Sequence, residues 1–308
     1  MPDASFTVVL SALNEEGLIG EAIASVQAQT REDLELIVID DGSSDGTAAV
    51  AQGLARKDER IRVIRQENRG LAASLNTGAA AGSAPVIALI DADDLWMPEF
   101  LERMGVVLES VPQAGFAFTD AWWFDMSSGR FFRRTPSEYM GAPEVAPSEP
   151  EALARSIMPG NWIFGLTAMR RAAFERVGGF SEHLRSSEDY ELWLRMLAHG
   201  YAGVRAPGKL VVYRDRSGSM TKNTATMYES LAEVYRLAAA EHPFPEDIRA
   251  LARERLSELE RQVAQESEGR IWLGKLRRRL LPRTVWLREP PTEVARVFPA
   301  MSDRRPSG

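Results

Sequence analysis

The chain has 308 residues, enough to bury a sizeable core in one large domain with an appendage. Its formal net charge of −7 argues against a general nucleic-acid-binding protein, which normally carries a basic face, so we expect no nucleic-acid partner. The absence of cysteine excludes disulfides, thiolate metal sites and cysteine nucleophiles, and it fits a reducing compartment.

The first 120 residues alternate between short β-branched runs and longer helical stretches. The expected strands cover residues 7–11, 34–40, 61–65, 86–91 and 115–120. The expected helices cover residues 18–29, 47–57, 71–81 and 98–110, the last with Pro98 as its first residue. Nearly continuous apolar strands that alternate with helices predict an α/β fold, with a mostly parallel central sheet covered by helices on both faces.

The pattern changes after the fifth expected strand. Between about residues 122 and 159, aromatic, proline and glycine residues intermingle, which indicates loops over a cleft. Further elements are expected at 164–169 (strand), 171–177 (helix), 188–199 (helix) and 209–214 (strand). The remainder is helical and charged, with a break at Pro243 and Pro245. We therefore expect a main domain over residues 1–224 and a helical C-terminal appendage over residues 225–308.

Polar residues gather where the expected parallel strands end, which is the edge at which such sheets bind ligands. Asp91, Asp93 and Asp94 follow one apolar run. Three carboxylates there would raise one another's pKa unless a cation compensates, and Mg²⁺ or Mn²⁺ shared with substrate phosphates is such a cation. The alternative is a turn that only caps the next helix.

Two other strand ends carry related signals. Asp41 follows the second expected strand and could accept hydrogen bonds from a ribose hydroxyl or a base N–H. Alternatively, it only orders the turn before a helix that Ser44 or Asp45 caps; of the two aspartates, we expect Asp45 to be structural and Asp41 to face the ligand. The first strand is followed by the sequence LNEE at 13–16, which is neither a G-x-G-x-x-G loop nor a phosphate-binding P-loop. This argues against a hydride-transfer enzyme and against a P-loop nucleotidase.

Together these segments resemble family 2 of the glycosyltransferases, which have the Rossmann-like GT-A fold. The matching segments are VLSALNEE at 9–16, VIDDGSSDGT at 38–47, NTG at 76–78, IDADD at 90–94 followed by Pro98, GGF at 178–180 and SEDYELW at 187–193. Their order and spacing across residues 6–221 make the resemblance specific, and the tail is not covered by it. The resemblance implies that residues 1–224 form a GT-A catalytic domain.

The resemblance implies an inverting, hexosyltransferase-type glycosyltransferase. Its partners would be a nucleoside-diphosphate sugar donor, UDP or dTDP by family habit, and a saccharide or lipid-linked acceptor with a free hydroxyl. Its cofactor would be Mn²⁺ or Mg²⁺, and its expected setting is surface polysaccharide or glycolipid synthesis. The sugar, the base and the acceptor are not specified by the sequence.

The resemblance also assigns residues to the donor site. Ser11 and Leu13 fall where the family contacts the nucleobase, and Glu15 of the same segment is assigned to the donor site. Leu13 replaces a frequent aromatic residue, so stacking on the base is lost or supplied elsewhere. Asp41 falls on the base-binding or ribose-binding aspartate of the family.

A second group of residues is assigned to the chemistry. Asp91 and Asp93 fall on the D-x-D that holds the metal and the diphosphate, and Asp189 matches the proposed catalytic base. A base is needed because the attacking hydroxyl must lose its proton, although Asp189 could also be an N-terminal helix carboxylate favoured by the macrodipole. The sequence YRDRSGS at 213–219 puts Arg216 where the family often has histidine. Arginine cannot ligate a cation but can pair with a diphosphate.

Two further features allow more than one interpretation. Trp122, Trp123, Trp162 and Phe164 could line an acceptor site or belong to the core. Gly269–Arg288 is basic and apolar with no acidic residue, which suits a helix on an anionic bilayer, but equally a helix packed on the main domain or a homo-oligomer interface. Because signal-peptide and membrane-spanning patterns are absent, we expect a cytoplasmic protein, peripheral at the inner face of the cell membrane if this segment binds lipid.

Three other classes of protein fit less well. A sugar-nucleotide pyrophosphorylase-like nucleotidyltransferase would have a glycine-rich, basic loop after its first strand, where this chain is acidic. A haloacid-dehalogenase-like phosphatase carries its D-x-D on the first strand, whereas here it follows the fourth. A non-catalytic nucleotide-sugar-binding protein would not need Asp41, Asp91, Asp93 and Asp189 together.

Overall fold

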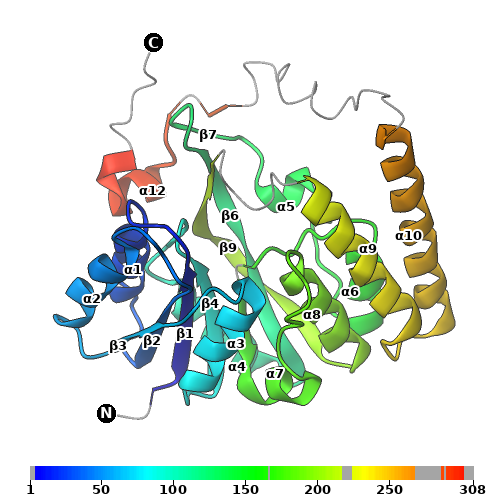
Figure 1. The fold of residues 1–308 in the computed structure, drawn as a ribbon, viewed down its shortest axis with the longest axis horizontal. Coiled ribbons are helices and arrows are strands. Elements are labelled where there is room, and N and C mark those ends of the chain that lie inside the picture. Colours follow the sequence, from blue (N-terminus) through cyan, green and yellow to red (C-terminus); the bar gives the residue numbers. More distant parts are fainter. Residues whose placement is uncertain (1–3, 166, 217–223, 268–285, 288, 302–308) are drawn as a thin grey trace.

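The computed structural model describes residues 4–165, 167–216, 224–267, 286–287 and 289–301 (Figure 1). The strands are β1 (Phe6–Ala12), β2 (Leu34–Asp40), β3 (Ile61–Arg65), β4 (Val86–Asp91), β5 (Leu95–Trp96), β6 (Ala114–Asp125), β7 (Arg130–Phe131), β8 (Thr167–Arg170) and β9 (Ala202–Asp215). The helices are α1 (Ile19–Gln27), α2 (Thr47–Ala55), α3 (Leu71–Ala81), α4 (Phe100–Ser110), α5 (Pro136–Tyr139), α6 (Pro150–Ile157), α7 (Arg171–Val177), α8 (Glu188–Ala198), α9 (Thr224–Ala240), α10 (Glu246–Ser267) and α12 (Thr292–Val297), followed by the 3₁₀ turn η3 (Pro299–Met301).

One sheet organises the fold, in the order β3-β2-β1-β4-β8-β6-β9-β5, with β7 paired to β6. Strands β1 to β4 run parallel, as the alternation of apolar runs and helices predicts. β8 is antiparallel to both β4 and β6, and β9 runs parallel to β6. The carboxyl ends of β1, β2, β4, β6 and β9 therefore point toward the same edge of the sheet, where ligand sites of such sheets lie.

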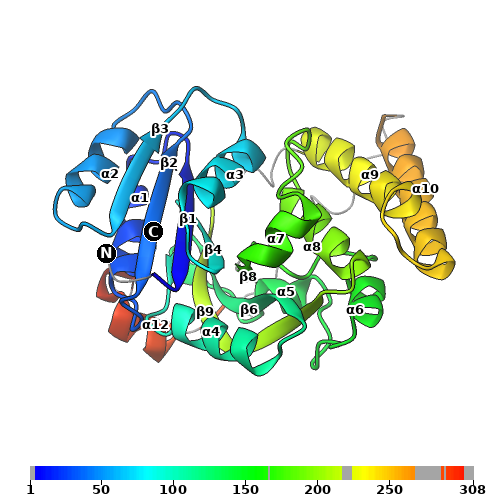
Figure 2. The ribbon, with the colours of Figure 1, turned by 90° about the horizontal axis from the view of Figure 1, so that it is seen from below.

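Alternate side chains of the central strands enter two separate hydrophobic cores. Val9 of β1 and Leu89 of β4 belong to a cluster with residues of α3, α6, α7 and α8. Val8 and Ile90, one position away, belong to a cluster with residues of α1, α2 and α4. Because successive residues of a strand face opposite sides, this alternation places helices on both faces of the sheet (Figure 2).

The structure differs from the expected elements mainly in the second half. Part of the segment expected to form loops instead extends β6 to Asp125 and forms β7, α5 and α6. The strand expected at 164–169 begins only at Thr167, and the one expected at 209–214 is the end of the longer β9. Bulges in the pairing of β6 with β9 interrupt the two-residue period, so the full strands are not visible as a pattern. Pro98 does not open α4, which begins at Phe100 after Glu99.

The C-terminal part of the described chain packs in two places. α9 and α10 lie on the opposite side of the molecule from α2 (Figures 1 and 2), and Val234 and Ile248 share a cluster with Trp193 of α8. Val294 of α12 instead packs with residues of β6 and β9. The division at residue 224 remains a prediction.

The segment Gly269–Arg288 lies outside the described residues except for Trp286 and Leu287. Among the described helices, none combines the length and the apolar character needed to cross a membrane.

Candidate active site

The turn after β4 concentrates negative charge at the carboxyl edge of the sheet. Asp94 is 1% exposed and accepts a hydrogen bond from the backbone N–H of Arg214 at 3.0 Å. Burial raises its pKa well above the ordinary value, and the charges of Asp93 and Asp91 raise it further. Asp91 is exposed as a residue, but the removal of water from its carboxyl raises the pKa to about 7. The negative charges of Asp93, Asp189 and Glu15 raise this pKa further. These carboxylates therefore share one electrostatic site.

Arg216 provides a positive charge within this site. Its Nε donates to Asp93 Oδ2 at 2.8 Å, and its Nη2 donates to Glu15 Oε1. The Glu15 side chain is 11% exposed, and reduced hydration raises its pKa although Arg216 acts in the opposite direction. One guanidinium thus joins the loop after β1 to the loop after β4, and the expected site residues Glu15, Asp93 and Arg216 lie together.

Arg214, two residues earlier on β9, plays a different part. Its side chain is 1% exposed, and it donates to the backbone carbonyl of Asp93 and to Glu21. Because it bonds a backbone carbonyl and is buried, Arg214 fixes the shape of the acidic turn. Sequence reasoning did not assign Arg214, and the signal available was its place in the YRDR run beside Arg216.

Asp41 organises the loop that follows β3. It is 3% exposed and accepts hydrogen bonds from Gln66 Nε2 at 2.8 Å and from the backbone N–H groups of Arg69 and Gly70 at 3.0 and 2.9 Å. Gly70 has a φ of 88°, which favours glycine, and it leads directly into α3. Asp41 therefore has an ordering role in the structure, and its contact with a nucleoside remains a prediction.

The loop after β1 is tied to the loop after β2. Asn14 has a φ of 57°, its backbone N–H donates to Ser43 Oγ at 2.9 Å, and its Oδ1 accepts from Ser44. Ser11 pairs with Asp91 in the register of β1 and β4, and Leu13 is 41% exposed. An exposed Leu13 next to Asn14 leaves an apolar surface at the position assigned to the nucleobase.

Asp189 lies in the first turn of α8. Burial raises its pKa to about 6, against hydrogen bonds from the backbone N–H groups of Tyr190 and Asp189 itself. The pKa of Glu188, which is 7% exposed, is raised to about 8 by burial and then by the charges of Asp189 and Asp91. Since the charge of Asp189 also raises the pKa of Asp91, the start of α8 and the end of β4 face the same site.

Backbone strain marks two of these segments. Among the described residues, the non-glycine residues with positive φ are Asn14 and Ser187. Asn14 directly precedes the site residue Glu15, and Ser187 lies two residues before Asp189. Such conformations cost about 1–3 kcal/mol and persist where the surrounding structure holds them.

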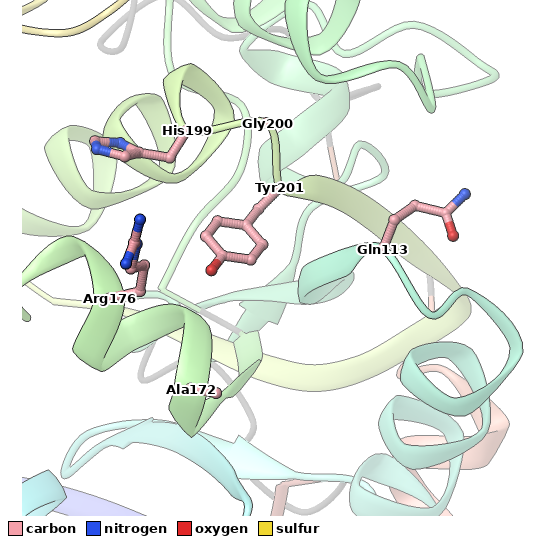
Figure 3. Close-up of a pocket in the computed structure, with 6 residues that line it drawn as sticks. All are labelled: Gln113, Ala172, Arg176, His199, Gly200 and Tyr201. Atoms are coloured by element: carbon pink, nitrogen blue, oxygen red, sulfur yellow. The ribbon is translucent and has the colours of Figure 1, made fainter.

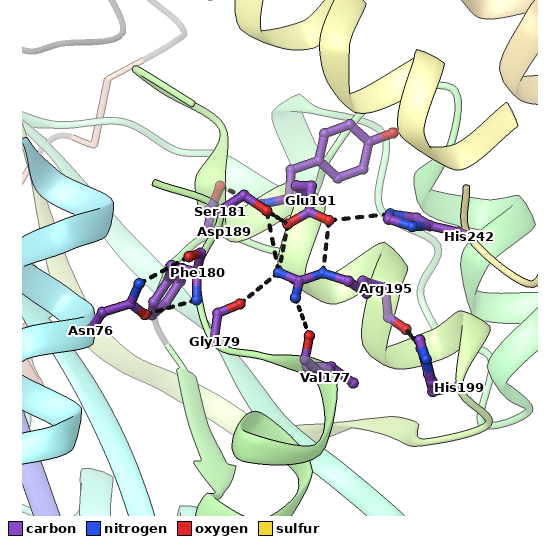
Figure 4. Close-up of polar contacts among 11 residues, drawn as sticks. Asn76, Val177, Gly179, Phe180, Ser181, Asp189, Glu191, Arg195, His199 and His242 are labelled. Atoms are coloured by element: carbon purple, nitrogen blue, oxygen red, sulfur yellow. Dashed lines mark hydrogen bonds and ion pairs between the residues drawn. The ribbon is translucent and has the colours of Figure 1, made fainter. Parts of the chain in front are cut away.

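A buried polar network holds α8 in place (Figure 4). Glu191, one turn from Glu188, is 1% exposed and accepts two hydrogen bonds of 2.8 Å from Arg195 and one from Ser181 Oγ. His242, between α9 and α10, lies 3.2 Å from Glu191 Oε1. Arg195 also donates to the backbone carbonyls of Val177 and Gly179. The helix that carries Asp189 is thereby fixed to the end of α7 and to the C-terminal helices.

A surface pocket of about 620 Å³ lies elsewhere (Figure 3). Gln113, Ala172, Arg176, His199, Gly200 and Tyr201 line it. Gln113 and Tyr201 directly precede β6 and β9, so the pocket lies at the amino ends of these strands, whereas Arg214 and Arg216 lie at the carboxyl end of β9. It is therefore not part of the carboxylate site.

Two of the four aromatic residues considered for an acceptor site belong to the core, and the other two are partly buried. Trp123 is 8% exposed and Trp162 is 2% exposed, and Trp162 packs edge-on against Phe118. Phe164 is partly buried against the cluster of α1, α2 and α4. Trp122 is partly buried beneath the ammonium of Lys209, 4.0 Å from the ring centroid.

The sequence of the chain is similar to those of known proteins. Residues 7–178 match the model of the family described as Glycosyl transferase family 2. The chain is 35% identical over 228 residues to the succinoglycan biosynthesis protein ExoU of Rhizobium meliloti (strain 1021), a match that covers 70% of this chain and 64% of ExoU. The chain thus spans just under two thirds of the length of that relative.

Solved structures share the fold. S. aureus TarS 1–349 in complex with UDP-GlcNAc superposes with a TM-score of 0.61 at 18% identity, covering 82% of this chain and 71% of that one. The mannosyltransferase PcManGT from Pyrobaculum calidifontis, in complex with GDP-Man and Mn²⁺, superposes with a TM-score of 0.64 at 19% identity, covering 88% and 77%. These likenesses confirm the expected GT-A-like α/β fold. With the family model matched across β1 to α7, the chain belongs to glycosyltransferase family 2.

Proposed function

We propose that this protein transfers a hexosyl group from a nucleoside-diphosphate sugar to an acceptor hydroxyl, with inversion at the anomeric carbon and with the help of a divalent cation. The observation that carries the proposal is the convergence of four side chains: Arg216 donates a hydrogen bond to Asp93, and Asp93, Asp189 and Arg216 all act on the pKa of Asp91. Acidic groups for a cation, a base for the acceptor and a guanidinium for a diphosphate are the groups that this reaction needs.

The acidic turn fits a divalent cation that is shared with a substrate. In the described part of the chain, no group of three or more His, Asp or Glu side chains is placed to hold a metal ion without a substrate. Asp91 and Asp93 can supply two ligands, and Mg²⁺ is usually bound by one or two carboxylates together with substrate phosphates. When bound, Mn²⁺ or Mg²⁺ supplies charge neutralisation to the diphosphate.

In the proposed reaction, Asp189 takes the proton of the acceptor hydroxyl. The acceptor oxygen bonds to the anomeric carbon as the bond from that carbon to the diphosphate oxygen breaks, and the nucleoside diphosphate leaves with the bonding electrons. A pKa raised to about 6 makes Asp189 a stronger base than an ordinary aspartate while leaving it mostly ionised at neutral pH. Arg216 stabilises the negative charge that develops on the departing diphosphate.

The donor and the acceptor are proposed from similarity to other proteins. TarS binds UDP-GlcNAc and PcManGT binds GDP-Man, and we propose UDP or dTDP for this chain on the resemblance alone. The likeness to ExoU supports a saccharide or lipid-linked acceptor in surface polysaccharide or glycolipid synthesis. We propose a cytoplasmic site of action, with Gly269–Arg288 as the membrane contact, because this segment combines basic and apolar residues.

The test begins with donor binding. Thermal unfolding of the full chain is measured with UDP, dTDP and GDP, each with and without Mn²⁺, because a ligand of the folded state raises its stability by RT ln(1 + [L]/Kd). The nucleotide that stabilises the protein selects the sugar donors. Glycosyl transfer to candidate saccharide acceptors is then followed by nucleotide release, and the anomeric configuration of the product is read by NMR.

Asp189→Asn keeps the shape of the side chain but cannot take the proton. Turnover should fall by about two to four orders of magnitude while nucleotide affinity is retained. Asp125→Asn is the matched control, since Asp125 ends β6 but accepts hydrogen bonds from Ser127 of its own turn. Near-wild-type transfer by Asp189→Asn would remove Asp189 from the mechanism, and a retained anomeric configuration would overturn the single displacement.

A further inference from the structure

Arg216 forms an ion pair with Asp93, one of the two carboxylates that the proposed function assigns to a metal ion. Its Nε donates to Asp93 Oδ2 at 2.8 Å, and its Nη2 pairs with Glu15. Asp93 is held in this way without a ligand, so its charge is already compensated within the protein. A divalent cation that approaches Asp91 and Asp93 therefore meets a positive charge next to one of its ligands.

The two arginines at the end of β9 differ in how readily they could move. Arg214 is 1% exposed and bonded to a backbone carbonyl, whereas Arg216 is 28% exposed and bonded only to carboxylates in the described part of the chain. A carboxylate partner can be exchanged for another anion without breaking the backbone framework. The diphosphate of a donor is a suitable anion, because a guanidinium binds phosphate through two parallel hydrogen bonds.

We propose that Arg216 is an internal counter-ion for Asp93 that makes divalent-cation binding conditional on a nucleoside diphosphate. Without the diphosphate, Arg216 holds Asp93 and Glu15 and keeps cation affinity low. With the diphosphate, Arg216 pairs with phosphate oxygens and releases Asp93 for the cation. Cation and nucleotide then bind cooperatively, and by linkage each raises the affinity of the other by the same factor.

This inference rests on the proposed function, but its readout is binding and not transfer. Mn²⁺ is titrated into the full chain by calorimetry, alone and with saturating UDP, or with GDP if UDP does not bind. For Arg216→Gln, affinity for Mn²⁺ alone should rise about tenfold or more, because Asp93 loses its competing cation. The gain in Mn²⁺ affinity on adding nucleotide should be correspondingly smaller than in the wild type.

Two further variants separate this role from a general effect on structure. Arg65→Gln removes an exposed arginine that pairs with Asp40 at 3.1 Å, and it should leave Mn²⁺ affinity unchanged. Arg216→Lys keeps the charge but has no planar fork to reach two carboxylates, so its Mn²⁺ affinity should lie between the wild type and Arg216→Gln. If Arg216→Gln is less stable, its unfolding midpoint should rise more with Mn²⁺ than that of the wild type.

The possible results separate the two proposals. If Arg216→Gln binds Mn²⁺ alone no more tightly than the wild type, although both bind it with nucleotide, the counter-ion role is wrong and the proposed transfer reaction stands. If neither protein binds Mn²⁺ even with nucleotide, the metal site of the proposed function is wrong and this inference falls with it.

Discussion

Replacing Glu191 by glutamine tests how strongly the buried network supports α8. The substitution keeps the shape of the side chain and removes its charge, so Arg195 and His242 lose their anionic partner. Glu191 is 1% exposed, so solvent screening does not weaken its interactions. Glu191→Gln should destabilise the fold and loosen α8, the helix that carries Asp189 in its first turn.

The size of the effect follows from the pKa of Glu191. Burial raises this pKa, but the His242 ring 3.2 Å away and the hydrogen bonds and charge of Arg195 bring it down from 4.5 to about 2. A difference of about 2.5 pKa units corresponds to roughly 3 kcal/mol at neutral pH. Removing one partner of a buried ion pair typically costs about 3–5 kcal/mol, which agrees with this value.

The pH dependence has a defined sign. Because the folded pKa lies below the unfolded pKa, the stabilisation by Glu191 is complete above pH 4.5 and is lost as the pH falls toward about 2. The difference in unfolding free energy between the wild type and Glu191→Gln should therefore shrink as the pH falls from about 4.5 toward 2. Urea unfolding of both proteins at pH 7, 5 and 3 measures this difference.

The control is Glu151→Gln on α6. Glu151 pairs with Arg155 at 3.2 Å but is 55% exposed, and exposed pairs contribute about 0–1 kcal/mol. The decrease in unfolding free energy caused by Glu151→Gln should be small at every pH. A Glu191→Gln protein within 1 kcal/mol of the wild type at pH 7, or a difference that does not shrink at pH 3, would refute this account of the network.

Further predictions concern the sheet, the donor site and the tail. Gly78→Ala places a methyl group 2.3 Å from Val9 Cγ1 and should cost about 1–3 kcal/mol in urea unfolding, whereas Gly53→Ala, which meets only a guanidinium atom at 3.9 Å, should not destabilise. Asp41→Ala should lower UDP affinity with and without Mn²⁺ in calorimetry, and unchanged affinity would leave Asp41 with only its ordering role. The intact protein should sediment with anionic liposomes and be released at high salt, and replacing the arginines at 277–279 by glutamine should weaken this; no sedimentation at low salt would favour packing or an oligomer interface.

The first half of the fold could be predicted because local and long-range signals agree there. The predicted bounds of β2, β3, β4 and α3 are confirmed. β2 and β4 are nearly continuous apolar runs, and α3 buries a face of mostly small residues. The antiparallel direction of β8 could not be predicted, because a strand of four residues that leads directly into α7 carries no directional signal. β5 has only two residues and exists through its pairing with Val211 and Val212.

The acidic residues of the candidate site could be predicted, but the ion pairs that they form with arginine could not. Strand ends and family spacing point to Asp91, Asp93 and Asp189. That Arg216 pairs with Glu15 depends on residues 201 positions apart, which no local pattern reports. The ordering role of Asp41 toward residues 66–70 could not be predicted for the same reason, since its partners are the Gln66 side chain and two backbone N–H groups of a distant loop.

The position of β9 in the chain has a consequence for synthesis on the ribosome. The acidic turn after β4 is translated 120 or more residues before the arginines that pair with it. A nascent chain that has emerged only to α8 would carry Asp91, Asp93 and Asp94 without these cations and would leave the β6 and β5 edges without β9. Since long-range strand pairing is slow, docking of β9 is expected to be a late folding event, and chains truncated before residue 214 should be targets for chaperones and proteases.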